Sequence, residues 1–343
     1  MNGAFMTAEM NEQPAMLARI LAESDSRLAE VVRALRDRPP RFVLFIARGT
    51  SDHAALYAKY LVETRLGLAA GLASPSTMTV YDSHPDLRDV LCIAVSQSGG
   101  SPDLYEPLSR ARAGGAMTLA VTNAPDSPLA QSAEFHLDIL AGPERAVAAT
   151  KSYTAELLTL YLLIERLAAG GADPAYLPER AAAVLSLEGE IDVLARRYRF
   201  ADQLVVTARG YNYATARETA LKLMETSYIV ANAFSGADLL HGPMAMIHRG
   251  FPVLAIVPPG PGSTALQPVL QRLKEIGADT LVVGDAPAAR LGTVGLTLPD
   301  LGPEALSPIL AILPMQQFAF HLARQRGLDP DEPRGLQKVT ETW

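Results

Sequence analysis

Short apolar runs alternate with polar loops and helical patterns along the chain. The run at 90–95 has the length and the β-branched residues of a strand buried on both faces. It ends in the loop Ser-Gln-Ser-Gly-Gly-Ser at 96–101, and an apolar repeat of helical period follows from Leu104. Ser101 is the expected N-cap of that helix, and Pro102 suits its first position. This stretch is therefore predicted to be a strand, a hydroxyl- and glycine-rich loop and a helix N-terminus.

An earlier stretch of the chain has the same organisation. The run Phe42–Ala47 predicts a strand, and a helix is expected at 51–66 with Ser51 as its N-cap. Strands that alternate with helices at this spacing predict an α/β fold, a parallel sheet covered on both faces. Ligands of such sheets bind beyond the carboxyl ends of the strands, where the loops near Ser51 and at 96–101 converge if their strands are neighbours. Further strands are expected at 69–74 and 116–122, and further helices at 13–37, 154–169 and 178–200.

The second half of the chain repeats the first. Ala47–Gly49 recurs as Ala208–Gly210, 161 residues later, and each tripeptide follows an apolar run. The run at 90–95 recurs at 252–257, 162 residues later, but the loop after the second copy has lost the serines. Two landmarks at nearly one offset predict an internal duplication. We therefore expect two doubly wound parallel-sheet subdomains at 1–195 and 196–329, followed by a tail at 330–343. Because only the first subdomain keeps the serines of its loop, we expect it to hold a phosphate and the second to carry the catalytic residues.

The loop at 96–101 has the composition of an anion site. Backbone N–H groups and the positive end of a helix point to one place there, and three serines add hydroxyl donors. Such a loop suits a phosphate monoester. It contains no lysine, so it is not the GxxxxGK[ST] loop of nucleotide-binding proteins. The alternative is an ordinary polar turn between a strand and a helix, because small polar residues are common in such turns.

Charge and composition argue against several classes of function. The net charge of −7 and a pI near 5.5 disfavour a nucleic-acid or an anionic-membrane partner. No apolar run approaches the ~20 residues that span a bilayer, and the first residues lack a basic region followed by an apolar core, so a cytoplasmic protein is expected. The single cysteine, Cys92, lies in the apolar run at 90–95. One cysteine alone cannot form a disulfide or a cysteine metal site within the chain, and we expect a buried, inert thiol.

The second half carries three further candidates. Glu218, Lys222 and Glu225 stand at helical spacings of four and three, and the alternative is an exposed ion pair with a spare carboxylate. His241 lies between apolar residues and a Gly-Pro break, where a loop position favours function over a core or capping role. Lys338 lies in the tail, which taken alone reads as a solvated C-terminus.

Six motifs, in their order and spacing, resemble the sugar isomerase (SIS) family. Within it they resemble the isomerase half of glutamine–fructose-6-phosphate amidotransferase and the SIS-type glucosamine-6-phosphate deaminases, over nearly the whole chain. The motifs are GTS at 49–51, SQSG at 96–99, VAATK at 147–151, ALKLMETSYI at 220–229, HGP at 241–243 and PRGLQK at 333–338.

The resemblance implies two SIS subdomains, a homodimer with its active site at the subunit interface, and a sugar-phosphate substrate. Glu225 would move a proton between C1 and C2, His241 lent by the partner subunit would open the sugar ring, and Lys338 would reach the active site and form a Schiff base with the ketose. Glu218 and Lys222 are placed with these catalytic residues. The phosphate would be held by Ser51, Ser96, Gln97, Ser98 and Ser101, and the sugar by Thr50, Val147 and Ala149.

The chain departs from the family at two positions near the sugar, and these leave the preferred sugar open. Gly100 stands where the family usually has glutamate, and Ala149 where it commonly has serine. A glutaminase domain would use an N-terminal cysteine thiol, and we expect no such domain before residue 1. On this basis we expect that the chain does not generate ammonia from glutamine by itself.

The expected function is conversion of glucosamine-6-phosphate and water to fructose-6-phosphate and ammonia, without a cofactor or a metal. A carboxylate and a histidine suit the two proton transfers that this reaction needs. The alternatives are an aminotransferase-type isomerase that lacks its glutaminase domain, a deaminase of another hexosamine or fructosyl-amine phosphate, and a non-catalytic sugar-phosphate sensor. Retention of Glu225, His241 and Lys338 disfavours the sensor, as does the absence of a basic helix-turn-helix segment.

Overall fold

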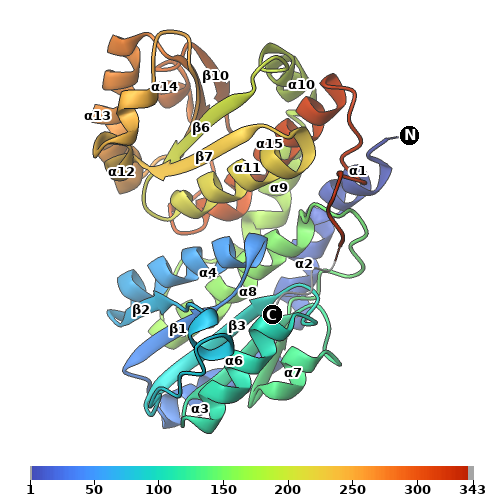
Figure 1. Ribbon diagram of the computed structural model, residues 1–343, viewed down its shortest axis with the longest axis vertical. Coiled ribbons are helices and arrows are strands. Elements are labelled where there is room, and N and C mark those ends of the chain that lie inside the picture. The colour runs from blue at the N-terminus through green and yellow to red at the C-terminus, as the bar shows by residue number, and fades with distance from the viewer. Residues whose placement is uncertain (1, 339–343) are drawn as a thin grey trace. The chain divides into compact units, whose positions relative to one another are not determined.

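The protein contains two five-stranded parallel sheets with helices packed around each (Figure 1). The structure is a computed structural model and describes residues 2–338. The chain divides into two compact units that interleave along the sequence. The first-sheet unit contains residues 15–144 and 151–175 with Gln337 and Lys338, and the second-sheet unit contains residues 2–14, 145–150 and 176–336.

The first sheet has the strand order β2-β1-β3-β4-β5. Its strands are β1 (Phe42–Ile46), β2 (Ala69–Leu72), β3 (Val90–Ser96), β4 (Met117–Thr122) and β5 (Phe135–Asp138). The helices near it are α2 (Gln13–Glu23), α3 (Asp25–Asp37), α4 (Gly49–Leu61) with a π-helical turn (Val62–Leu66), α5 (Ser76–Thr79), α6 (Pro102–Ala113), α7 (Pro128–Ser132) and α8 (Lys151–Ala168).

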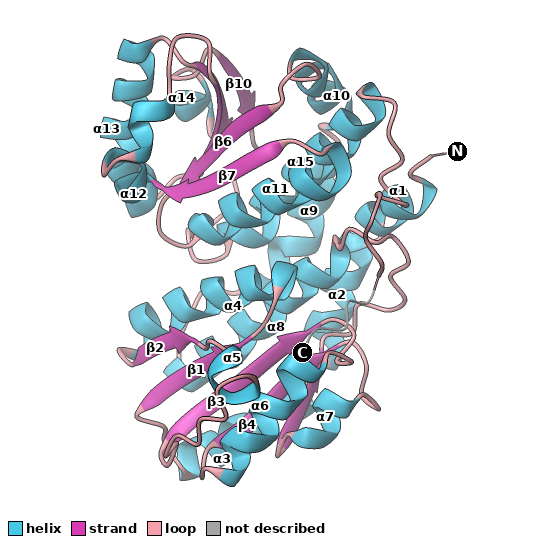
Figure 2. Ribbon diagram, in the orientation of Figure 1, coloured by secondary structure: helices cyan, strands magenta, loops and turns pink. Residues whose placement is uncertain are grey.

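The central strand β3 is covered on both faces, as its apolar sequence predicts (Figure 2). Successive side chains of a strand point to opposite faces. Cys92 and Ala94 pack with Leu104 and Leu108 of α6 on one face. Helices α4 and α8 contact each other, and α4 also contacts β1 and β3. The sheet is therefore the middle layer of three.

The second sheet repeats the topology of the first. Its strands are β6 (Gln203–Ala208), β7 (Val230–Ser235), β8 (Pro252–Val257), β9 (Asp279–Gly284) and β10 (Val294–Thr297). Their order, β10-β9-β8-β6-β7, matches the first sheet strand for strand when β6 is aligned with β1. The predicted α/β class and internal duplication are thus confirmed.

Helix α15 (Ser307–Gln325) of the second-sheet unit is the most completely buried helix in the described part of the chain. Residues 307–323 of α15 are all buried, and α15 contacts α9, α10 and α11. Such all-round burial explains why its sequence is apolar on every face. The helices are α1 (Ala4–Asn11), α9 (Leu177–Leu185), α10 (Glu188–Arg197), α11 (Asn212–Ser227), α12 (Gly236–Leu240), α13 (Pro261–Ile276), α14 (Ala286–Ala289) and α15 (Ser307–Gln325), with 3-10 turns at Pro174–Tyr176 and Pro243–Met246.

Ser51 is not the N-cap of α4, contrary to the sequence prediction. The helix begins at Gly49, whose φ of 56° is left-handed, and Arg48 occupies the N-cap position. Ser51 consequently lies inside the first turn of the helix. Across residues 2–338, no helix is both long and apolar enough to cross a membrane.

Candidate functional site

The loop between β3 and α6 is folded tightly on itself. Ser96 Oγ accepts a hydrogen bond from the Gly99 N–H at 3.1 Å, and Ser98 Oγ accepts one from the Gly100 N–H at 3.4 Å. Gly99 has a φ of 62°, and a Cβ there would come within 2.2 Å of Ser127 Oγ. Only glycine fits this position. Because the two serine oxygens act as acceptors from the backbone, their hydroxyl hydrogens remain available to rotate toward an anion.

The N-terminus of α6 adds to this loop. Ser101 is the N-cap residue by position, as predicted, but its side chain accepts no hydrogen bond from the helix, unlike Ser127 at the start of α7. Ser101 is buried, whereas Gln97 and Ser98 are half-buried and accessible. Partial positive charge at the end of this twelve-residue helix favours an anion beside the loop.

The loop after β1 lies beside the loop after β3. The two strands are neighbours in register, with Ile46 opposite Ala94. Arg48 joins the loops by donating to Asp103 Oδ2 from Nε at 2.8 Å and from Nη2 at 2.5 Å. Asp103 is buried, while the Arg48 side chain is 49% exposed. The two polar loops therefore meet at the carboxyl edge of the sheet, as the sequence predicts, and a guanidinium stands next to them.

Ser51 differs from the serines of the other loop. Its hydroxyl is buried and donates to Glu156 Oε1 on α8 at 2.8 Å. A hydroxyl has one hydrogen, and here it is directed at a carboxylate. Thr50, one residue earlier, is half-buried. The assignment of Ser51 to the phosphate stays a prediction, and it requires this hydroxyl to change partners.

The corresponding loop of the second sheet holds a carboxylate of the protein itself. Glu304 Oε1 accepts a hydrogen bond from the Gly262 N–H in the first turn of α13 at 2.9 Å. A Cβ at Gly260 or Gly262 would come within 2.6 or 2.5 Å of the Glu304 carboxyl group. Burial raises the pKa of Glu304, and the Gly262 hydrogen bond opposes this rise. The second copy of the loop is thus filled, which fits a phosphate site in the first copy.

Three charged side chains form a buried cluster on α11. Lys222 Nζ lies 3.2 Å from Glu218 Oε1 and 2.5 Å from Glu225 Oε2. Glu218 and Lys222 are 0% and 1% exposed, whereas Glu225 is 21% exposed. The alternative of an exposed surface pair is therefore wrong. Burial alone would lower the pKa of Lys222, but Glu218 and Glu225 raise it well above its usual range.

Glu225 and His241 lie at opposite ends of the second sheet. Helix α11 connects the carboxyl end of β6 to the start of its parallel neighbour β7, and Glu225, three residues from the helix end, therefore lies near the start of β7. His241 follows α12, beyond the carboxyl end of β7, and its side chain is exposed. The six residues of β7 alone span about 20 Å. Within one chain, Glu225 and His241 therefore lie apart, at opposite ends of the second sheet.

Lys338 contacts a buried carboxylate in the first-sheet unit. Its Nζ donates to Glu144 Oε2 at 2.8 Å. Burial alone would raise the pKa of Glu144, but Lys338 and the hydrogen bonds from Ser152 bring it below its usual value. The alternative of a solvated C-terminus concerned the tail at 330–343, of which 339–343 lie outside the described residues; Lys338 itself is only 23% exposed.

Val147 and Ala149 lie in an irregular segment of the second-sheet unit. Ala146, Ala148 and Thr150 are buried, while the two alternate residues are half-buried and present one accessible face. Polar groups hold the segment in place. The Ala146 N–H donates to Glu9, and Gln316 Nε2 donates to the Thr150 carbonyl at 3.0 Å.

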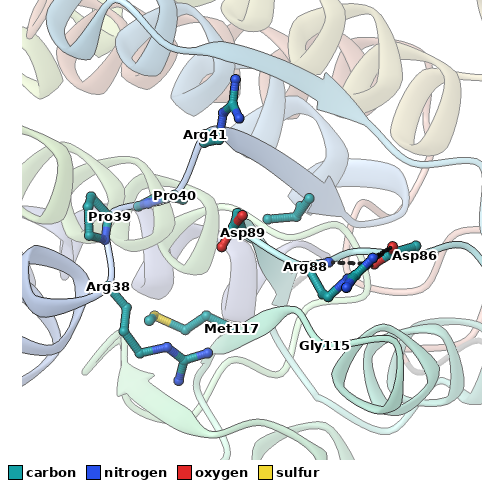
Figure 3. A pocket seen from close by; sticks show the side chains of 10 residues that line it. Arg38, Pro39, Pro40, Arg41, Asp86, Arg88, Asp89, Gly115 and Met117 are labelled. Carbon is teal, nitrogen blue, oxygen red and sulfur yellow. Dashed lines mark hydrogen bonds and ion pairs between the residues drawn. The ribbon is translucent and has the colours of Figure 1, made fainter.

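A cavity of about 800 Å³ opens at the other end of the first sheet. Figure 3 shows it lined by Arg38, Arg41 and the Arg88–Asp86 ion pair, near the amino ends of β1, β3 and β4. None of the predicted site residues lines it. Parallel sheets bind ligands at the carboxyl ends of their strands, so this cavity is not the candidate site. Residues 2–338 also contain no group of three or more histidine, cysteine or acidic side chains placed to hold a metal ion.

Comparison with known families decides the classification. The family described as the SIS domain matches residues 38–166 and 198–323, one match over each sheet. The chain belongs to the SIS family. Both SIS matches cover the strand–loop–helix units described above, so the duplicated sheets are its two SIS domains.

Relatives of this SIS chain share its fold over nearly its whole length. The glutamine–fructose-6-phosphate aminotransferase (isomerizing) of Methanothermobacter thermautotrophicus is 36% identical over 342 residues, covering 97% of the chain but 57% of that protein. The solved C-terminal domain of glucosamine–fructose-6-phosphate aminotransferase from Francisella tularensis is 26% identical with a TM-score of 0.86, covering 96% of the chain and 98% of the domain. A glucosamine-6-phosphate deaminase structure from Thermotoga maritima is 20% identical with a TM-score of 0.75, covering 99% and 100%, and shows the fold alone.

Several residues of these sites were not identified from the sequence. Asp103, Glu156 and Glu304 belong to none of the motifs that the sequence analysis singled out. Each acquires its role from a partner 42 to 105 positions away in the chain. Glu144 could have been identified from the sequence, because it stands three residues before the VAATK motif.

Proposed function

We propose that this SIS chain catalyses the isomerase reaction of the aminotransferase type, which interconverts fructose-6-phosphate plus ammonia with glucosamine-6-phosphate plus water and includes a proton transfer between C1 and C2. The buried Glu218–Lys222–Glu225 cluster is the observation that carries the proposal. Similarity to proteins named as isomerizing aminotransferases over 97% of the chain supports it. Because the chain spans only 57% of such a relative, the glutamine-dependent part of that activity is not assigned to it.

Glu225 is the proposed proton carrier because it is the accessible member of the cluster. Its two partners are buried, so a substrate can reach only this carboxylate. The Lys222 ammonium lies 2.5 Å from Glu225 Oε2, so the carboxylate is held in place at the cluster's accessible side. Lys222 itself remains protonated at neutral pH, since its pKa is raised, and so it does not supply a neutral amine.

The phosphate is assigned to the loop at 96–101. Ser96, Gln97, Ser98 and Ser101 present hydroxyl and amide groups beside the N-terminus of α6, and Arg48 adds a positive charge. Charge-assisted hydrogen bonds of this kind contribute roughly 1.5–3 kcal/mol each. Thr50, Ser51, Val147 and Ala149 are assigned to the sugar phosphate only through the family resemblance.

His241 is proposed to act in a neighbouring copy of the chain. It lies at the far end of β7 from Glu225, so a site that uses both side chains needs two subunits. A homodimer supplies this arrangement. The imidazole would then transfer the hydroxyl proton during ring opening.

Lys338 is proposed as the amine that forms a Schiff base with the ketose carbonyl. Lysine is a common nucleophile for carbonyl substrates once its amine is neutral. Of the two lysines at the candidate residues, Lys222 is almost completely buried between two carboxylates, whereas Lys338 is 23% exposed, and this accessibility leaves the role to Lys338.

The hydrolytic direction is the second candidate for the same residues. In that direction glucosamine-6-phosphate and water give fructose-6-phosphate and ammonia. The departures Gly100 and Ala149 favour a ligand contact that differs from that of the aminotransferases. A synthase and a deaminase share the proton transfer and differ in the source and the fate of the amine.

A substrate panel distinguishes these possibilities. The purified chain is incubated with glucosamine-6-phosphate, galactosamine-6-phosphate, or fructose-6-phosphate plus ammonium or glutamine, and sugar phosphates and ammonia are both quantified. Interconversion of the glucosamine and fructose phosphates supports the proposal. Net ammonia release from glucosamine-6-phosphate without use of glutamine would establish the deaminase. No turnover of any substrate, together with binding of sugar phosphate, would establish a sensor.

A further inference from the structure

Glu144 is a buried carboxylate with three donors around it. Lys338 Nζ donates to Oε2 at 2.8 Å, and Ser152 Oγ donates to the same oxygen at 2.7 Å. The Ser152 N–H donates to Oε1 at 3.1 Å. The Glu144 side chain is 0% exposed, so these contacts replace the water that an ionised carboxylate would otherwise bind.

Ser152 fixes the orientation of this carboxylate from α8. It is the second residue of that helix, so its N–H is one of the donors that the helix itself leaves unsatisfied. Its hydroxyl reaches the other carboxylate oxygen. Two bonds from one rigid helix start leave the carboxylate with a defined direction, and that direction points to Lys338.

The partner comes from far away in the sequence. Lys338 lies 194 residues after Glu144 and beyond the last helix, where no strand or helix restrains it. An ion pair to a buried, oriented carboxylate therefore restrains this lysine side chain. Such charge-assisted bonds are shorter and stronger than neutral ones.

We propose that Glu144 is a positioning residue, which holds the ε-amino group of Lys338 at a fixed place in the first-sheet unit, with Ser152 orienting Glu144. The proposal rests on the proposed function insofar as Lys338 is taken to be the reactive amine. An amine bound to a carboxylate is an ammonium ion, which does not attack a carbonyl. The contact is thus the resting position from which Lys338 departs during the reaction.

Two measurements separate the question whether Glu144 holds Lys338 in place from the question whether Lys338 takes part in the reaction. Trp343 is the only tryptophan of the chain and stands five residues after Lys338, so its fluorescence anisotropy reports how firmly the tail is held. Steady-state kinetics report kcat and KM for the sugar phosphate. The variants are Glu144→Ala, Glu144→Gln, Glu144→Asp and Ser152→Ala. Lys338→Arg keeps the ion pair without a Schiff-base amine, and Asp86→Asn removes the acid of an exposed ion pair as a matched control.

Glu144→Ala should lower the Trp343 anisotropy and reduce kcat by about 10–100-fold, because loss of placement of a reacting group costs this much, with KM nearly unchanged. Glu144→Asp should recover part of the anisotropy and part of kcat. Glu144→Gln and Ser152→Ala should give values of both between those of Glu144→Ala and the wild type. Asp86→Asn should match the wild type. Lys338→Arg should keep the anisotropy and lose turnover.

Unchanged anisotropy in Glu144→Ala and Glu144→Gln would overturn the proposal, whatever happens to kcat. A fall in anisotropy, with no turnover even in the wild type, would keep the anchor and refute the proposed function instead. If Glu144→Ala does not fold, Lys338→Met breaks the same contact from its more exposed side. It should lower the anisotropy, and an unchanged value would contradict the anchor.

Discussion

Lys222→Met should destabilise the second-sheet unit far more than a surface lysine change does. Lys222 lies between two carboxylates, at 3.2 Å from Glu218 and 2.5 Å from Glu225, and it is almost completely buried. Methionine fills a similar volume but leaves Glu218 buried without its cation. Removing one partner of a buried ion pair costs about 3–5 kcal/mol, and the low end applies because Glu225 is partly exposed.

The matched control is Lys59→Met. Lys59 also pairs with a carboxylate four residues away on a helix, Glu63, at 2.7 Å, but both side chains are substantially exposed. Exposed pairs of this kind contribute at most about 0.5 kcal/mol. The two substitutions are chemically identical, and the sites differ in burial and in the number of paired carboxylates, two for Lys222 and one for Lys59.

Urea unfolding measures the difference. With a slope of about 1–3 kcal/mol per molar urea, a loss of about 3 kcal/mol lowers the midpoint by about 1 M or more. The Lys59 variant should shift it by less than about 0.5 M. Because the raised pKa of Lys222 belongs to a cation, its contribution is complete below the pKa of the unfolded chain and is lost only as pH rises through the folded value. The deficit should therefore be constant from pH 6 to 9. Equal shifts for the two variants would refute the argument from burial.

Three further predictions concern the site and the core. Glu225→Gln should stay folded, with a thermal midpoint below that of the wild type because buried Lys222 keeps only one of its two carboxylate partners, and should lower turnover by about 10²–10⁴-fold; normal turnover would remove Glu225 from the chemistry. Ser98→Ala should weaken binding of a sugar phosphate by about 10–100-fold in calorimetric titration, and equal affinities would exclude the loop at 96–101. Burial raises the pKa of Cys92 to about 12, so a thiol reagent at pH 8 should label it only on unfolding, and rapid labelling of the folded protein would contradict its burial.

The sequence predicted the elements with long apolar runs and missed the shorter or mixed ones. β3, β4 and β8 follow their predicted ranges closely, because strands buried on both faces need uninterrupted apolar sequence. The strand β5 was not predicted, since the edge sequence Phe-His-Leu-Asp at 135–138 carries polar residues and is only four residues long. The β-propensity of the residues and their hydrophobic pattern predict strands less well at the edge of a sheet than in its centre.

The residue types of the candidate site could be predicted, but their environment could not. Spacings of four and three place Glu218, Lys222 and Glu225 near one another on any helix, exposed or buried. Only packing of α11 against β7 and α15 makes the cluster buried. Tertiary contacts likewise decide that Glu304 fills the second copy of the loop, since its partner Gly262 lies 42 residues earlier.

Proton exchange at C1 of fructose-6-phosphate tests the central claim most directly, because it does not depend on the direction of the overall reaction. The purified chain is incubated with fructose-6-phosphate and ammonium in D2O, and the C1 protons are followed by NMR. We predict that one C1 proton is replaced by deuterium in the wild type and that Glu225→Gln abolishes the replacement. Binding of the sugar phosphate without any exchange at C1, or exchange that persists in Glu225→Gln, would contradict the assignment of this chain as an isomerase that uses Glu225.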